Sequence, residues 1–291
     1  MKKILSGKKA IITGSSQGLG LKIASKFILA GADIMICGRN KKTLNNAKNQ
    51  LIDIAKSGQK IVTQVADVSK QNDVKVIVAE TLKQLGGCHI LVNNAGILGP
   101  KDVVELNNWD DWVKTVEINL FGSVLMCREL IQYFKKQNYG KIIQLSGGGA
   151  TKPRPNFSAY ASSKAAIVRF CETLAEELRG TGIDVNSIAP GVLNTRMLDE
   201  ILKAGPDKVG QHDYKQSLDQ SKNGSKSLEK GSDLAVFLAS SASDGITAKI
   251  ISAIWDNWKD WPLYLDDLSS SDIYTIRRII GKDRNYEWGD K

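Results

Sequence analysis

The chain has 291 residues, of which 42% are apolar, and its 40 Lys and Arg exceed its 31 Asp and Glu, giving a formal net charge of +9. This length and composition exclude a disordered chain, a collagen-like repeat and a small disulfide-stapled scaffold. The basic residues occur as scattered pairs such as Lys8-Lys9 and Lys41-Lys42 rather than as one long block, so we expect no nucleic-acid partner.

Short apolar runs alternate along the chain with longer segments of helical periodicity. The runs predict strands at residues 10–13, 34–37, 61–65, 90–93, 141–146, 184–188 and 250–254. The segments between them include predicted helices at 19–30, 41–57, 72–85, 119–135 and 159–179. This alternation is typical of right-handed βαβ crossovers, which build a parallel sheet with helices on both faces. The sequence therefore predicts a doubly wound α/β fold with a parallel seven-stranded sheet.

The first predicted strand runs directly into a glycine-rich loop at residues 13–20, Thr-Gly-Ser-Ser-Gln-Gly-Leu-Gly, which opens the first helix. Gly14 permits a tight turn, Gly18 lets the backbone approach a pyrophosphate, and Gly20 lets helix and strand pack closely. The amides and dipole of the helix N-terminus favour the anion. An ordinary strand-to-helix turn also uses glycine. We favour a Rossmann-type dinucleotide site.

The second predicted strand ends without an acidic residue. Enzymes that prefer unphosphorylated NAD place an acid there to bind the ribose 2′-hydroxyl. Here the strand is followed by Gly38-Arg39-Asn40. The guanidinium of Arg39 can form charge-assisted hydrogen bonds with a 2′-phosphate. We therefore predict NADP(H) rather than NAD(H), the alternative being that Arg39 is a solvated turn residue.

The sequence offers few candidates for acid–base chemistry by histidine, since it contains only His89 and His212. Of its seven tyrosines, only Tyr160 has a lysine four residues later, Lys164. On a helix this spacing puts both side chains on one face, and a nearby cation lowers the pKa of a phenol. Ser146 ends a predicted strand at the edge where doubly wound sheets bind ligands. Its hydroxyl could polarise a carbonyl.

Together and in this order, the motifs resemble those of the short-chain dehydrogenase/reductase family across residues 6–250. They are the loop at 13–20, Asp67-Val68, Asn93-Asn94-Ala95-Gly96, Asn119, Ser146, Tyr160-x-x-x-Lys164 and Pro190-Gly191 followed by Thr195. The resemblance implies an NADP(H)-dependent oxidoreductase that interconverts a ketone and a secondary alcohol by hydride transfer. A 3-oxoacyl thioester, a sugar derivative and another small ketone all remain open as substrates.

The resemblance also implies a catalytic set, Asn119, Ser146, Tyr160 and Lys164. Ser146 would orient the carbonyl and Tyr160 would exchange the proton with the alcohol oxygen. Asn119 would hold a water in a proton relay toward Lys164, which would also bind the nicotinamide ribose. The implied cofactor-binding residues are Gly14, Ser15, Ser16, Gln17, Gly18, Leu19, Gly20, Arg39, Asp67, Val68, Asn93, Ala95, Gly96, Tyr160, Lys164, Pro190, Gly191 and Thr195. Asp67 would meet the adenine, and Thr195 the nicotinamide carboxamide.

The sequence predicts a single domain at residues 1–255, with one unusual segment inside it and one after it. Residues 193–230 are rich in turn formers and predict a mobile substrate lid. Residues 256–291 form a Trp-rich C-terminal extension that is unusual for the family. Its tryptophans either pack on the core or a neighbouring subunit, which we favour, or form an aromatic wall for the substrate. The spacing from Ser146 to Tyr160 is also one residue longer than is commonest in the family.

The cysteines and the ends of the chain bear on location and partners. The four cysteines lie far apart without metal-ligand spacing, so no metal is expected. The N-terminus turns polar early, and no run reaches the ~18 apolar residues of a membrane span. We expect a cytoplasmic protein without membrane association.

Two further expectations concern assembly and an alternative function. The resemblance implies a homodimer or homotetramer that associates through the helices at 119–135 and 159–179. A non-catalytic, cofactor-sensing or scaffold protein with a Rossmann fold is the alternative to an enzyme. The complete set Asn119, Ser146, Tyr160 and Lys164 favours catalysis.

Overall fold

The computed structural model describes residues 3–223 and 226–288. Predictions for residues 1–2, 224–225 and 289–291, at the two ends of the chain and inside the predicted lid, lie outside the described residues.

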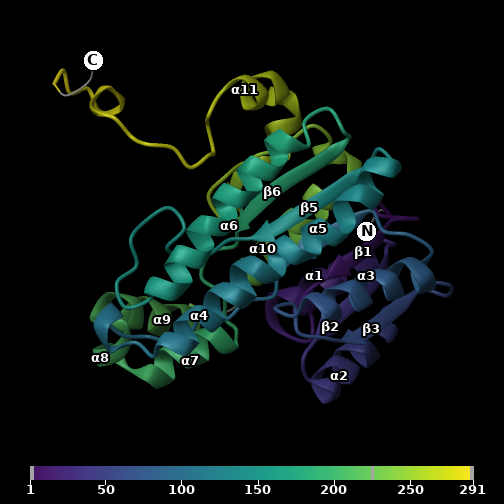
Figure 1. The fold of residues 1–291 in the computed structure, drawn as a ribbon, viewed down its shortest axis with the longest axis horizontal. Helices are drawn as coiled ribbons and strands as arrows, with labels where there is room; N and C mark the ends of the chain where they lie inside the picture. Colours follow the sequence, from purple (N-terminus) through teal and green to yellow (C-terminus); the bar gives the residue numbers. More distant parts are fainter. Residues whose placement is uncertain (1–2, 224–225, 289–291) are drawn as a thin grey trace.

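Across the described residues, seven strands form one sheet in the order β3-β2-β1-β4-β5-β6-β7 (Figure 1). Each neighbouring pair is parallel. The strands are β1 Lys9–Ile12, β2 Asp33–Gly38, β3 Ile61–Val65, β4 Ile90–Asn93, β5 Gly140–Leu145, β6 Ile183–Ala189 and β7 Ile250–Ser252. The predicted doubly wound fold is confirmed. From β1 at the centre, the chain adds β2 and β3 on one side and then crosses back to add β4 on the other side of β1. The topological switch point therefore lies between β1 and β4, and sheets of this kind bind ligands at such a point.

Helices α1, α2 and α10 cover one face of this sheet and α3, α5 and α6 the other. The helices of the described residues are α1 Gly18–Leu29, α2 Lys41–Ile52, α3 Gln71–Leu85, α4 Trp109–Val116, α5 Gly122–Lys136, α6 Ser158–Glu177, α7 Arg196–Ala204, α8 Pro206–Val209, α9 Gln211–Asn223, α10 Lys226–Ala239 and α11 Leu265–Ser270. Side chains of a strand alternate between its faces. Ile12 accordingly belongs to the apolar cluster that includes residues of α1, α2 and α10, and its neighbour Ile11 belongs to the cluster that includes residues of α3, α5 and α6.

The helical segment before β5 begins earlier than predicted. We expected a helix at 119–135, but α4 precedes it and is joined to α5 by a π-helical turn, Glu117–Phe121. Asn108 caps α4, because its Oδ1 accepts a hydrogen bond from the Asp111 amide at 2.9 Å. An Asn before two acidic residues is an N-cap signal that was present in the sequence.

The predicted lid is largely helical in the described residues, as α7, α8 and α9. Its glycines separate these helices instead of making an irregular loop. Gly205 follows α7 with a φ of +79° and Gly210 follows α8 with a φ of +82°. Since this region of φ favours glycine, both positions are natural helix ends. That the segment opens and closes remains a prediction.

The Trp-rich extension contributes side chains to the core. Trp258 is buried 5.1 Å from the ring of Phe237 on α10, and Trp261 is buried 4.4 Å from the ring of Tyr274. The Ile250 amide of β7 donates to the Tyr274 carbonyl at 2.8 Å. Past α11 the chain still contacts α6, where the Ile276 amide donates to Glu172 Oε1 at 2.7 Å, and beyond that contact it runs away from the sheet and helices (Figure 1).

Candidate active site

A cavity of about 1250 Å³, here called the cleft, opens among the loops that follow the strands, at the carboxyl edge of the sheet. Most of the predicted site residues line it. They are Gly14, Ser16, Gln17, Gly18, Leu19, Gly20, Arg39, Asp67, Val68, Ala95, Gly96, Ser146, Tyr160, Lys164, Pro190, Gly191 and Thr195. The structure thus brings together residues from almost the whole length of the α/β domain.

At Gly14 and Gly20 the glycine loop is packed so closely that a side chain does not fit. Gly14 has a φ of +62° and Gly18 a φ of +58°. A Cβ atom on Gly14 would lie 2.8 Å from the Cα of Ala95, and one on Gly20 would lie 2.6 Å from the Gly14 carbonyl oxygen. A Cβ atom on Gly18 would meet Thr195 at 3.4 Å. The bare backbone at the start of α1 is the surface on which a pyrophosphate can rest.

Two residues that we expected to bind the cofactor, Ser15 and Asn93, are not among the lining residues of the cleft. Ser15 is fully buried, where its Oγ donates to the Ile12 carbonyl at 2.6 Å and accepts from the Cys37 amide at 3.2 Å. Asn93 is buried, and its Nδ2 donates to the Ser123 carbonyl at 3.4 Å. Neither residue lines the cleft, because Ser15 bonds β1 to β2 and Asn93 bonds to α5.

Asn119 also lies behind the wall of the cleft. Its Nδ2 donates to the Ile97 carbonyl at 3.0 Å and to Ser163 Oγ at 2.9 Å, and its Oδ1 accepts from the Ile97 amide at 2.9 Å. These bonds tie the loop after β4 to α6. The relay water that we expected at Asn119 stays a prediction.

The hydrogen bonds between Thr13 and Asn94, here called the clamp, were not predicted from the sequence, although both residues lie in the motifs quoted there. Asn94 Nδ2 donates to the carbonyls of Thr13 and Gly14, at 2.9 and 3.1 Å. Thr13 Oγ1 accepts from the amides of Asn94 and Ala95, both at 3.0 Å. The clamp fixes the glycine loop to the loop after β4, across the switch point of the sheet.

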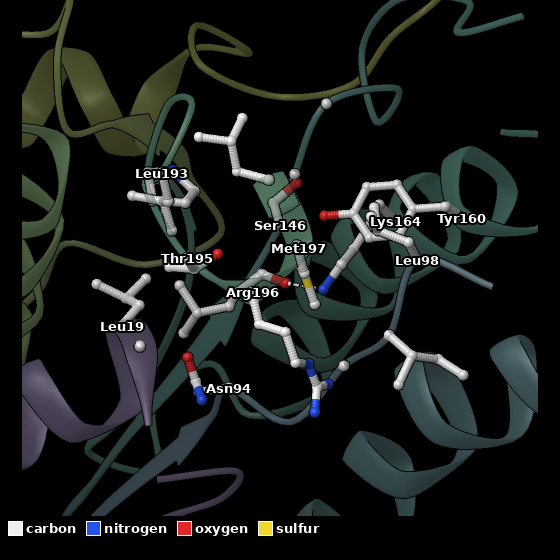
Figure 2. Close-up of a pocket in the computed structure, with 18 of the residues that line it drawn as sticks. Leu19, Asn94, Leu98, Ser146, Tyr160, Lys164, Leu193, Thr195, Arg196 and Met197 are labelled. Carbon is white, nitrogen blue, oxygen red and sulfur yellow. Dashed lines mark hydrogen bonds between the residues drawn. The ribbon is translucent and has the colours of Figure 1, made fainter. Parts of the chain in front are cut away.

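Ser146, Tyr160 and Lys164 meet at one end of the cleft. Figure 2 shows the Tyr160 hydroxyl directed toward Ser146. The Ser146 Oγ is buried and has no hydrogen-bond partner among the described residues. The Lys164 Nζ donates to the Leu145 carbonyl at 2.7 Å and lies 5.7 Å from the centroid of the Tyr160 ring. A serine hydroxyl, a phenol and an ammonium group thus surround one point.

Burial determines the ionisation of these groups. It raises the pKa of Tyr160 above its ordinary value, and the charge of Arg154 offsets part of that effect. Burial lowers the pKa of Lys164 to about 8. Our expectation that the pKa of Tyr160 is lowered is therefore wrong for this structure. The i,i+4 spacing indicated the cation but not the desolvation, which is the larger effect.

The opposite end of the cleft combines a cation with an ionised carboxyl group. Partial burial opposes ionisation of Asp67, but hydrogen bonds from the Ser69 hydroxyl and amide outweigh it and lower its pKa, with help from the charges of Lys114 and Arg39. Arg39 itself is exposed and lines the cleft. A guanidinium thus stands where the second strand ends.

In the described part of the chain, no group of three His, Cys, Asp or Glu side chains is arranged to hold a metal ion. None of the helices in the described ranges is long and apolar enough to span a membrane.

Comparison with known proteins identifies the family to which this chain belongs. The family model for short chain dehydrogenases matches residues 8–205. The chain belongs to the short-chain dehydrogenase family. Members of this family are oxidoreductases that bind NAD or NADP.

This short-chain dehydrogenase has relatives with different activities. It is 36% identical over 193 residues to glucose 1-dehydrogenase of Gluconobacter oxydans, covering 65% of this chain and 71% of the relative. It is 31% identical over 252 residues to the 3-oxoacyl-acyl-carrier-protein reductase FabG of Chlamydia muridarum, covering 87% and 98%. The crystal structure of levodione reductase shares the fold, with a TM-score of 0.78 at 24% identity, covering 85% and 96% of the two chains.

Proposed function

We propose that this short-chain dehydrogenase interconverts a ketone and a secondary alcohol, with NADP(H) as the hydride carrier and Tyr160 as the acid/base. The observation that carries the proposal is the Ser146 hydroxyl, which is buried without a partner among the described residues while the Tyr160 hydroxyl points toward it (Figure 2). A buried hydroxyl without a hydrogen bond costs free energy. A substrate oxygen between Ser146 and Tyr160 would satisfy it.

The side chains suggest how the proton moves. In reduction, Ser146 and Tyr160 donate hydrogen bonds to the carbonyl oxygen, and Tyr160 gives up its proton as the alcohol forms. A raised pKa keeps that proton on Tyr160 at neutral pH, as a general acid requires. The ammonium of Lys164 then stabilises the phenolate. The bound nicotinamide supplies the hydride.

The same proposal assigns the rest of the cleft to the cofactor. Its lining at the start of α1 suits a dinucleotide, because Gly18 and Gly20 carry no side chain between the backbone amides and a pyrophosphate. We place the pyrophosphate against the glycine loop, the adenine near Asp67 and the carboxamide near Thr195. Asn119 orients α6 through Ser163, and so holds the acid/base in place.

Replacing Arg39 with Ala tests the preference for NADP(H). We expect NADPH to bind roughly tenfold more weakly, because a charge-assisted hydrogen bond to the 2′-phosphate is lost. NADH affinity should change by less than about twofold, since NADH has no such phosphate. Both affinities are measured by nicotinamide fluorescence. Lys42→Ala, which removes an exposed charge outside the cleft, is the matched control. Equal losses for the two nucleotides would refute the role of Arg39.

The reaction class is tested by following NADPH consumption with a panel of ketones, including 3-oxoacyl thioesters and keto derivatives of sugars. Turnover of any of them supports the proposal and begins to name the substrate. If the protein binds NADPH but turns over none of the panel, the result contradicts the proposed catalysis and favours the cofactor-sensing or scaffold function.

We also propose a cytoplasmic homodimer or homotetramer. The four cysteines are buried free thiols, which suits a reducing compartment. Two large apolar side chains of the α4–α5 segment are exposed, Trp109 by 69% and Phe121 by 52%. Such side chains are typical of an association surface. Light scattering measures the mass in solution, and a monomer would contradict the assembly.

A further inference from the structure

Arg154 lies in the loop between β5 and α6, the segment that is one residue longer than is commonest in the family. Its Nε donates to Asp213 Oδ2 on α9 at 2.9 Å, and the two side chains are only 19% and 16% exposed. Its guanidinium carbon lies 3.9 Å from the centroid of the Phe157 ring. Contacts with a carboxylate and an aromatic ring therefore hold Arg154 in one place.

The same guanidinium acts on Tyr160. Its carbon lies 5.7 Å from the centroid of the Tyr160 ring, the same distance as the Nζ of Lys164. The positive charge of Arg154 opposes the rise that burial causes in the pKa of Tyr160. Both residues line the cleft, where a charge is screened less than at an open surface.

Other charged or titratable groups line this end of the cleft. They are Lys152 in the same loop, Lys164 on α6, Arg196 on α7, and His212 and Asp213 on α9. Lys152, Arg196 and His212 are all exposed, and Arg196 also pairs with Glu200 at 3.2 Å. Arg154 differs from Lys152, Arg196 and His212 by its partial burial and by its position 5.7 Å from the centroid of the Tyr160 ring.

We propose that Arg154 is a positioning residue for proton transfer, in which its guanidinium, held by Asp213 and Phe157, stabilises the phenolate of Tyr160. The inference rests on the proposed role of Tyr160 as acid/base. Asp213 belongs to α9, within the predicted lid. The position of the lid therefore affects the charge that Tyr160 experiences.

The pH profile of alcohol oxidation tests this role with Arg154→Met, which keeps an apolar contact with Phe157 and removes the charge. Oxidation needs the phenolate, so kcat/KM rises with pH through the titration of Tyr160. Without Arg154 the rising limb moves to higher pH, and the rate below the midpoint falls roughly three- to tenfold, while the limiting rate at high pH is retained. Arg154→Lys should restore most of the wild-type profile. A lower limiting rate with an unchanged midpoint would show a merely structural role and overturn the proposal.

A second measurement needs no substrate. In protein labelled at the tyrosine Cζ with ¹³C, the NMR signal of Tyr160, identified by its loss in Tyr160→Phe, reports the phenolate directly. We expect the midpoint of this signal to move to higher pH in Arg154→Met. Arg154→Gln should show the same shift, and it replaces Arg154→Met if that variant does not fold.

Lys208→Gln is the matched control, because it removes another ion pair of the predicted lid, between Lys208 and Asp102, that does not touch Tyr160. Its midpoint should equal that of the wild type. An unmoved signal in the Arg154 variants, or an equal shift in Lys208→Gln, overturns the inference. If no ketone is turned over, the proposed function fails, but the NMR titration still decides whether Arg154 acts on Tyr160.

Discussion

Replacing Tyr160 with Phe lowers turnover about 10³-fold, within the range that general acid–base catalysis contributes. The ring of Tyr160 packs with Leu98, Ile201 and Val209 in an apolar cluster that Phe preserves. Only the hydroxyl directed into the cleft is lost. NADPH affinity should therefore remain within about twofold of wild type, since the substitution removes no charge that binds the nucleotide. NADPH consumption and nicotinamide fluorescence measure the two effects separately.

Tyr214→Phe is the control for Tyr160→Phe. Tyr214 is a half-buried phenol packed against the same apolar cluster but outside the cleft lining. It should retain wild-type turnover. Equal turnover in Tyr160→Phe and the wild type would remove Tyr160 from the mechanism.

Lys164→Met produces two large effects of opposite sign. Turnover falls about 10²-fold or more, because the phenolate loses its neighbouring cation. Stability at pH 7 rises relative to the wild type, because burial lowers the pKa of Lys164 from 10.5 to about 8 and so disfavours its charged form. From pH 8 to 10.5 the unfolded chain binds more protons than the folded one, so this cost disappears as the pH rises.

The difference in unfolding free energy between Lys164→Met and the wild type should therefore decrease by roughly 3 kcal/mol between pH 7 and pH 10.5. Urea unfolding of both proteins at the two pH values measures it. Lys230→Met, at an exposed position on α10, supplies the baseline for loss of a surface lysine. A difference that stays constant with pH would show that Lys164 is not a strained buried charge.

The sheet could be predicted because strand formation leaves a local pattern. Predicted strands 61–65 and 90–93 coincide with β3 and β4, while the predicted 250–254 outlasts β7 by two residues. The predicted lid shows the limit of such patterns. Its helix α9 carries few apolar residues. Helix α7 is apolar at Met197, Leu198, Ile201, Leu202 and Ala204, a helical spacing that was present in the sequence, but the turn formers around it outweighed that pattern in our prediction.

By itself, the sequence determined the order of strands and helices, the glycines of the first loop and the pairing of Tyr160 with Lys164. Each depends on neighbours a few positions apart: a period of two, a period of 3.6, or an i,i+4 spacing. Only the tertiary structure decided that Ser15 and Asn93 face inward and that burial raises the pKa of Tyr160. It alone decided that Arg154 meets Asp213, 59 residues away. Burial and long-range contacts arise when distant segments pack together, and no local pattern records them.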